Sequence, residues 1–307
     1  MSAFEPAYVR LLDSGELQVR ADLAHAGLTE CRQCAWECKT NRLAGKTGAC
    51  KTGVLAEVSS YGPHPGEERP LSGWSGSGTV FFARCNMRCQ YCQNAEISQQ
   101  QAGKPTSPEA LAGILLELQE MGCHNINLVS PSHVVAQILA AVLIAAQQGL
   151  RLPLVFNTGG YDSLESLRLL DGVIDIYMPD MKYSSAAIAK VYSKTPHYPQ
   201  VNQAALREMH RQVGDLMLDE NGLAQRGLLV RHLVLPNDLA GSAETLRFLA
   251  QEISHNTYLN IMEQYRPAFN GRQFPKLRRP ITSQEYLKVV EMAKACGLSR
   301  LDSQQQL

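Results

Sequence analysis

Short apolar runs alternate with longer amphipathic stretches along the chain from residue 78 onward. The apolar runs are bounded by glycine, proline and serine, and they predict buried strands at 80–83, 125–129, 152–156, 173–178, 228–235 and 258–262. The stretches between and after these runs have apolar positions at helical spacing and predict helices. Strict alternation of strand and helix predicts a parallel sheet with helices outside it. Six such units make an incomplete barrel, because a closed barrel of this type needs eight.

Two of the predicted helices begin with clear capping signals. Ser107 is a good N-cap and is followed by Pro108, which suits the first helical position. Thr282 and Glu285 have the spacing of a capping box. The sequence therefore fixes where the first and last helices of the alternating region begin.

The first 77 residues have a different character from the rest of the chain. Residues 1–28 predict a helical lead-in, and residues 59–78 are rich in glycine, proline and serine, which is typical of a connecting loop. We therefore expect an N-terminal segment over residues 1–77 and a core domain over residues 78–307.

Composition and charge narrow the class of protein. Of the 307 residues, 45% are hydrophobic and 19% are charged, which is typical of a globular protein with an ample core. Lysine and arginine total 29, as do aspartate and glutamate, and this neutral balance argues against a nucleic-acid binder. Residues 1–30 have no signal-peptide pattern, and no apolar run is long enough to cross a bilayer. We expect a cytoplasmic protein with no membrane association.

Cysteine is the residue type that points to chemistry. Seven of the nine cysteines fall between Cys31 and Cys92, and in a cytoplasmic protein such a group indicates metal or redox chemistry instead of disulfides. Cys85, Cys89 and Cys92 lie on one loop directly after the first predicted strand. Three thiolates hold three irons of a [4Fe–4S] cube and leave the fourth iron open to a small molecule. A disulfide or a zinc loop is the alternative, although zinc needs a fourth ligand that is absent nearby.

A second group of cysteines precedes the connecting loop. Gly45 and Gly48 allow the chain to turn between the third and fourth members of the group, which are Cys31, Cys34, Cys38 and Cys50. Zinc with four thiolates and an iron–sulfur cluster are both allowed by this spacing. We favour a second iron–sulfur cluster, because the protein already needs one.

The loop from Cys85 to Asn94 resembles the signature of the radical SAM superfamily. Other stretches that carry the resemblance are 41–45, 127–133, 177–183, 208–214, 231–236 and 264–267, and together they resemble the group related to pyruvate formate-lyase-activating enzyme. The resemblance implies a partial (β/α)6 barrel, a [4Fe–4S] cluster and S-adenosylmethionine (SAM). In that superfamily the open iron binds SAM, and an electron from the cluster releases a 5′-deoxyadenosyl radical. It also implies an electron donor such as flavodoxin or ferredoxin.

The same resemblance directs attention to the carboxyl ends of the predicted strands. The second strand ends at Ser130, Ser132 and His133, where many radical SAM enzymes carry a Gly-Gly-Glu-Pro turn that receives the SAM amino group. This departure leaves open which residue binds that group, and the two hydroxyls and the imidazole are our candidates. The third strand ends at Asn157 and Thr158, the first of which replaces a usual aspartate.

The fourth and fifth strands add the remaining candidates. Met178 and Asp180 match positions that, with Thr158, build a cation site near the SAM carboxylate in activating enzymes, and Lys182 follows. Arg231 lies in an otherwise apolar strand and needs an anionic partner if it is buried. The SAM carboxylate or a neighbouring acid would satisfy its guanidinium.

Three functions remain open from the sequence. The first is reductive cleavage of SAM for hydrogen abstraction from a glycine of a protein substrate, as in glycyl radical enzyme activation. The second is a radical SAM maturase that modifies a peptide or a small molecule. The third is a zinc or iron–sulfur adaptor without enzymatic activity.

Overall fold

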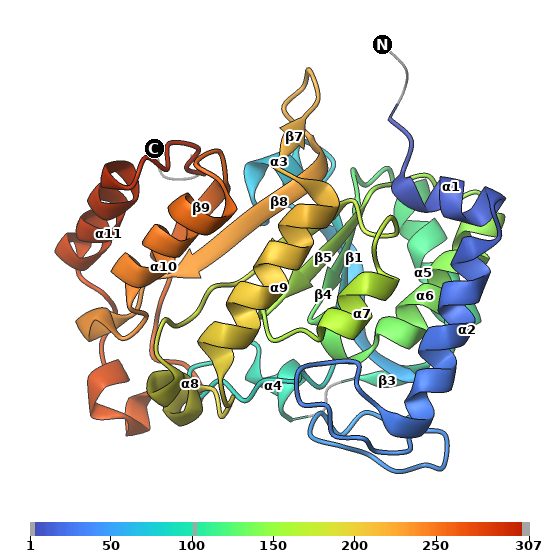
Figure 1. The fold of residues 1–307 in the computed structure, drawn as a ribbon, viewed down its shortest axis with the longest axis horizontal. Helices are drawn as coiled ribbons and strands as arrows, with labels where there is room; N and C mark the ends of the chain where they lie inside the picture. The colour runs from blue at the N-terminus through green and yellow to red at the C-terminus, as the bar shows by residue number, and fades with distance from the viewer. Residues whose placement is uncertain (1–3, 101–102, 303–307) are drawn as a thin grey trace.

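A curved, open sheet forms the centre of the molecule in the computed structural model, which describes residues 4–100 and 103–302 (Figure 1). Within these residues the sheet has nine strands in the order β3-β1-β2-β4-β5-β6-β8-β7, with β9 paired to β8. The strands are β1 (Ala56–His64), β2 (Ser77–Phe82), β3 (Lys104–Thr106), β4 (Ile126–Val129), β5 (Leu154–Thr158), β6 (Ile176–Pro179), β7 (Met217–Leu218), β8 (Ala224–Leu233) and β9 (Tyr258–Met262).

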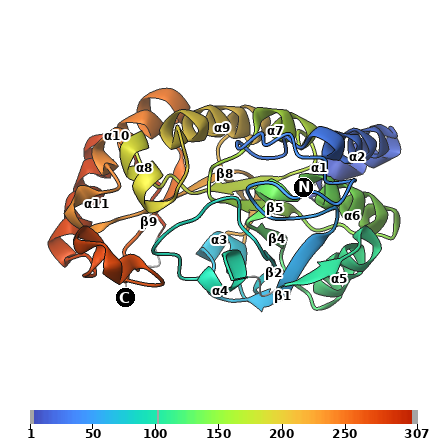
Figure 2. The same ribbon diagram turned by 90° about the horizontal axis from the view of Figure 1, so that it is seen from below.

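The six predicted strands form the parallel part of this sheet. They correspond to β2, β4, β5, β6, β8 and β9, and each pairs in parallel with the next. Figure 2 shows helices along the outer side of the curve, from α5 at one end to α11 at the other. The sheet does not close, so the predicted partial (β/α)6 barrel is confirmed.

Helices surround the sheet at the predicted places. The longer helices are α1 (Ala7–Asp13), α2 (Glu16–Ala26), α5 (Pro108–Glu120), α6 (Val135–Gln147), α7 (Leu164–Leu169), α8 (Ala186–Tyr192), α9 (Tyr198–Val213), α10 (Ser242–Phe248) and α11 (Ser283–Ala295). The Ser107 side chain accepts a hydrogen bond from the Ala110 amide, and the capping box of Thr282 and Glu285 is formed. Among the described residues, no helix combines the length and hydrophobicity needed to cross a bilayer.

The predicted connecting loop at 59–78 is wrong over its first part. Strand β1 covers Ala56–His64, pairs antiparallel with β2, and also pairs with the short β3. Gly62 and Pro63 suggested a loop, but both residues lie near the end of β1. This strand is the second from the edge of the sheet, and proline is tolerated near sheet edges. A short helix, α3 (Arg69–Ser72), occupies part of the remainder. The two-residue strand β7 was also not predicted.

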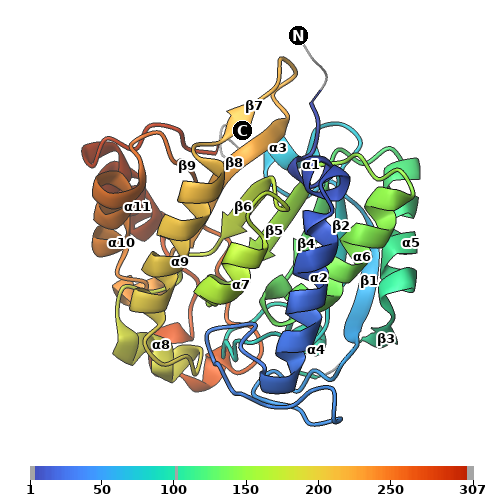
Figure 3. The same cartoon turned by 45° about the vertical axis from the view of Figure 1, so that its right-hand side comes forward.

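The N-terminal helices pack against the core. Figure 3 shows α2 beside α6, and the two helices are in contact. The hydroxyl of the buried Tyr8 donates to the Leu152 carbonyl oxygen at 3.0 Å. This confirms the helical lead-in over residues 7–26, and the division of the chain at residue 77 stays a prediction about its organisation.

Asp175 ties the N-terminal helix to the sheet and makes stability depend on pH. Its carboxylate accepts hydrogen bonds from the Ala7 amide at 2.9 Å and the Leu154 amide at 3.1 Å, and the residue is fully buried. Burial raises the pKa of Asp175 from 3.8 to about 7 despite these two donors. The raised pKa means that the folded state holds this proton more tightly than the unfolded state does.

We therefore expect Asp175 to make the protein less stable as pH rises from 4 to 7. Its contribution is fully present below the unfolded pKa and is lost as pH passes through the folded pKa. Between pH 5.5 and 8 this loss amounts to about 2 kcal/mol. Urea unfolding of the wild type and of Asp175→Asn at the two pH values measures it. A difference in unfolding free energy that is the same at both pH values would contradict the prediction.

Candidate functional site

The three-cysteine loop leaves the carboxyl end of β2 and runs into α4 (Ala95–Ser98). Arg84, at the start of the loop, has a positive φ of 62°, which turns the chain out of the strand. Cys85, Cys89 and Cys92 are all half-buried. The Cys85 amide donates to the Ser98 carbonyl oxygen at 3.0 Å, so the two ends of the loop are held together.

Each of the three sulfur atoms has a hydrogen-bond partner. The Met87 amide donates to Cys85 Sγ at 3.4 Å, the Ser193 hydroxyl donates to Cys89 Sγ at 3.0 Å, and Ser98 Oγ lies 3.3 Å from Cys92 Sγ. Burial raises the pKa of Cys89 to about 12. The free thiol is therefore protonated at neutral pH, and binding of a metal ion would release this proton.

Four of the predicted residues meet where β5, β6 and β8 end. Arg231 Nε donates to Asp180 Oδ1 at 2.9 Å, and a second Arg231 nitrogen donates to Asn157 Oδ1. Lys182 Nζ donates to the other oxygen of Asp180 at 2.5 Å. Burial opposes ionisation of Asp180, but Arg231 and Lys182 outweigh it and lower the pKa of the carboxyl. The acid is therefore charged at neutral pH.

A neighbouring acid, Glu67, was interpreted from the sequence as a residue of a solvated loop, and this interpretation is wrong. Glu67 follows β1, and its carboxylate lies 3.8 Å from an Arg231 guanidinium nitrogen, with only 12% of the side chain exposed. Residues 59–78 were interpreted as a connecting loop, and for this reason an approach of Glu67 to the site was considered less favourable than a solvated role. Arg231 therefore has acidic neighbours from both β6 and the segment after β1.

A second polar group joins the ends of β4 and β5. Ser132 Oγ and Thr158 Oγ1 are 2.9 Å apart, and the Thr158 hydroxyl lies 2.8 Å from Asp162. Asp162 was not predicted, although it closely follows the glycine pair after β5. Burial raises its pKa to about 6.

Gly160 is required where this group meets Asp180. It has a φ of +75°, and a Cβ here would lie 2.1 Å from Asn202 Nδ2 and 2.4 Å from the Asp180 carbonyl oxygen.

We expect Gly160→Ala to destabilise the protein by about 2 kcal/mol or more. Gly113→Ala is the matched control, because this glycine lies inside α5 with open space around it, and the change should stabilise by about 0.5–1 kcal/mol. Urea unfolding compares the two, and equal free energies would contradict the expectation.

His133 and Ser130 lie apart from the group around Asp180. Ser130 has a positive φ of 60°, and its amide donates to the Asn157 carbonyl oxygen. The buried His133 ring contacts the Ala83 carbonyl oxygen through Nε2 at 3.1 Å and faces the N-terminal cysteines. Burial, with Arg42 nearby, lowers the pKa of His133 to about 3. The predicted contact of these two residues with the SAM amino group stays a prediction.

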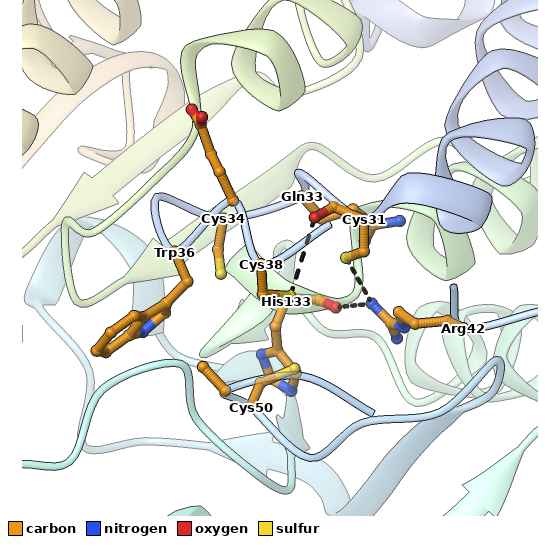
Figure 4. A pocket seen from close by; sticks show the side chains of 10 residues that line it. Cys31, Gln33, Cys34, Trp36, Cys38, Arg42, Cys50 and His133 are labelled. Carbon is orange, nitrogen blue, oxygen red and sulfur yellow. Dashed lines mark hydrogen bonds between the residues drawn. The ribbon is translucent and has the colours of Figure 1, made fainter. Parts of the chain in front are cut away.

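The four N-terminal cysteines surround one pocket. Figure 4 shows the side chains of Cys31, Cys34, Cys38 and Cys50 around it, with the His133 ring at the same pocket. Cys38 is exposed and the other three cysteines are buried. Gly48 allows this closure, because a Cβ there would lie 2.3 Å from Cys38 Sγ. The structure thus brings together cysteines that the sequence places up to nineteen residues apart.

Comparison with known proteins identifies the fold and its loop. The sequence model of the radical SAM superfamily matches residues 79–219, which include the three-cysteine loop. Residues 79–219 belong to the radical SAM superfamily. It is also 28% identical over 289 residues to an uncharacterized protein of Methanocaldococcus jannaschii, and the match covers 92% of this chain and 79% of that protein.

Two solved structures match parts of the chain at low sequence identity. One is a maturase of the [FeFe]-hydrogenase, with a TM-score of 0.48 and 14% identity over 71% of this chain and 48% of that chain. The other is a domain of pyruvate-formate lyase-activating enzyme from Bacteroides vulgatus, with a TM-score of 0.36 and 12% identity over 62% of this chain and 88% of that chain.

The residues of the three-cysteine loop fit the cofactors of the superfamily. Three cysteines on one loop, each sulfur with a hydrogen-bond partner, suit the ligands of a [4Fe–4S] cluster, whose potential depends on such bonds. Within residues 4–100 and 103–302, no three His, Cys, Asp or Glu side chains are arranged to bind a single metal ion.

Proposed function

We propose that this radical SAM enzyme reductively cleaves SAM and abstracts hydrogen from a glycine of a protein substrate. The observation that carries the first part is the half-buried Cys85, Cys89 and Cys92 loop at the carboxyl end of the first parallel strand, within the segment that matches the superfamily. Cys85, Cys89 and Cys92 would hold the cluster, which would supply the electron for reductive cleavage of SAM. The protein binds and orients the reactants and excludes water.

The residues at the strand ends have separate tasks in this proposal. Arg231 offers a guanidinium to the SAM carboxylate, while Asp180 and Asn157 hold the guanidinium in place. We assign the Ser132 and Thr158 hydroxyls to orientation of the SAM amino group, with Asp162 as the acceptor for both hydroxyls. Lys182 neutralises the second oxygen of Asp180, so that the acid does not repel the carboxylate of SAM.

The choice of a glycine substrate rests on the resemblance to activating enzymes described above. The reducing environment of the cytoplasm suits this chemistry and the nine free cysteines. A low-potential donor such as flavodoxin or ferredoxin would supply the electron. For the pocket of four cysteines we propose a second metal centre, of iron–sulfur or zinc type.

Two measurements test the proposed function. Anaerobically reconstituted protein should produce 5′-deoxyadenosine from SAM and dithionite, and absence of this product would contradict SAM cleavage. Incubation with candidate glycyl radical enzymes should then give the EPR doublet of a glycyl radical. If 5′-deoxyadenosine forms but no candidate gives the doublet, the product of a peptide or small-molecule substrate identifies a maturase instead.

A further inference from the structure

The two cysteine groups are in contact through one buried amide. Asn86 follows Cys85 in the loop and is 4% exposed. Its Oδ1 lies 3.7 Å from Cys85 Sγ, its Nδ2 donates to the Tyr161 carbonyl oxygen at 2.7 Å, and its side chain lies near the Cys34 thiol. A single side chain therefore spans the space between a cysteine of the three-cysteine loop and a cysteine of the four-cysteine pocket.

Two further contacts hold the groups in this arrangement. Trp36, two residues after Cys34, donates from Nε1 to the Asn86 carbonyl oxygen at 2.6 Å. Arg88 donates to the Cys85 carbonyl oxygen at 2.6 Å and to the Ala49 carbonyl oxygen, next to Cys50, at 2.8 Å. Contacts from the residues next to Cys34 and Cys50 thus connect the four-cysteine pocket to the three-cysteine loop.

The four-cysteine pocket contains a buried positive charge that needs a negative one. Arg42 is 1% exposed and donates to the carbonyl oxygens of Gly53 and His133, and its Nη1 lies 3.8 Å from Cys31 Sγ. Within the described part of the chain it has no carboxylate partner, and its Nη2 atom has no hydrogen-bond partner. An unpaired buried charge is costly. Thiolates that hold a metal centre with net negative charge would supply the missing partner.

The outer face of the pocket is basic. From Glu30 to Lys51 the sequence contains two acids, Glu30 and Glu37, and five bases, Arg32, Lys39, Arg42, Lys46 and Lys51, and Glu30 pairs with Arg32 and Lys39. Lys39, Lys46 and Lys51 are exposed, as is Cys38. In a chain with equal numbers of acids and bases, this concentration of positive charge favours the approach of an acidic protein.

We propose that Cys31, Cys34, Cys38 and Cys50 bind an iron–sulfur cluster that passes electrons, one at a time, to the SAM-cleaving cluster across Asn86. An acidic protein with a low-potential one-electron carrier docks at the basic face and reduces this cluster. The electron then moves to the cluster of the three-cysteine loop, and the donor leaves oxidised by one electron, with no bond formed or broken in either step. This inference rests on the proposed function, for which the cluster must be reduced.

Iron content and magnetic coupling test the site itself in full-length protein reconstituted without oxygen. We expect about eight irons per chain in the wild type and about four in Cys34→Ser, as for two cubes and one. In the fully reduced wild type, EPR should show broadening from two neighbouring paramagnetic clusters, and this broadening should be lost in Cys34→Ser. About four irons with bound zinc, or two reduced clusters without magnetic coupling, would overturn the proposal. The wild-type spectrum alone shows whether two neighbouring clusters are present, even if the variant fails to fold.

The route of the electron is tested by comparing a protein donor with a small one. In Lys39→Glu/Lys46→Glu, reduction by flavodoxin at low salt should be roughly tenfold slower or more, whereas reduction by dithionite and the iron content should be unchanged. Lys288→Glu/Lys294→Glu, two exposed lysines on α11, should leave both rates unchanged. Equal flavodoxin rates in the two variants would overturn the proposed entry point.

The outcomes separate this inference from the proposed function. If dithionite supports 5′-deoxyadenosine formation in wild type that contains zinc at the four cysteines, the relay is wrong and the SAM chemistry stands. If two coupled clusters are present but no 5′-deoxyadenosine forms, the proposed function is wrong and the paired site stands.

Discussion

Cys89→Ala is expected to abolish formation of 5′-deoxyadenosine. The residue is the middle ligand of the three-cysteine loop, and its sulfur receives the hydrogen bond of Ser193. Two thiolates on the loop cannot hold the cube in the same way, so the variant should lose about four irons per chain. The yield should fall by more than about 100-fold, beyond the loss caused by removing an outer partner of a metal ligand. Product analysis with SAM and dithionite measures this effect.

Cys296→Ala is the matched control for this change. Cys296 is the C-cap residue of α11, outside both cysteine groups, and the iron content and yield should stay at the wild-type level. If Cys89→Ala retains wild-type yield, the assignment of the loop as the cluster site is wrong.

Asp180→Ala is expected to have the second largest effect, because it removes the partner of two cations. Asp180 is 9% exposed and accepts from both Arg231 and Lys182. Its removal leaves two charges in a largely buried site, and loss of one member of such a group costs about 3–5 kcal/mol. Arg231 would also lose its orientation, so SAM should bind more weakly. Urea unfolding and calorimetric titration with SAM measure the two effects.

Asp171→Ala provides the comparison for this variant. Asp171 also pairs with an arginine, Arg211, but the two side chains are 37% and 57% exposed. An exposed pair contributes about 0–1 kcal/mol, and Asp171 lies outside the proposed SAM site, so SAM affinity should be unchanged. Equal destabilisation by the two changes would show that Asp180 is an ordinary surface acid.

The parallel strands were predictable because local sequence determines them. Runs such as 125–129 are apolar, short and followed by a helix with its own start and stop signals, and these features do not depend on distant residues. The carboxyl ends of parallel strands meet at one edge of a sheet. Knowledge of the strands was therefore enough to place Asn157, Asp180 and Arg231 near one another, and the structure brings them together.

The remaining features depend on contacts between distant segments. Strand β1 is stabilised by pairing with β2 and β3, which outweighs the local preference of Gly62 and Pro63 for a turn. Glu67 lies 164 positions before Arg231 in the sequence, and only the folded chain brings the two side chains together. The role of Asp162 becomes apparent only in the structure, where the Thr158 hydroxyl donates to its carboxylate. His133 follows the second predicted strand and was therefore expected at the SAM site. In the structure its ring faces the N-terminal cysteines, and Arg42 binds its carbonyl oxygen.

EPR spectroscopy of reduced, oxygen-free protein, recorded with and without SAM, tests most directly whether the three-cysteine loop carries a cluster with one open iron. A site of this kind changes its spectrum when SAM binds, since the ligand coordinates the iron itself. We predict a cluster signal that shifts on addition of SAM and a shift that is absent in Cys89→Ala. A wild-type signal that SAM leaves unchanged, or the absence of a cluster signal, would contradict the claim that this loop carries a cluster with one open iron.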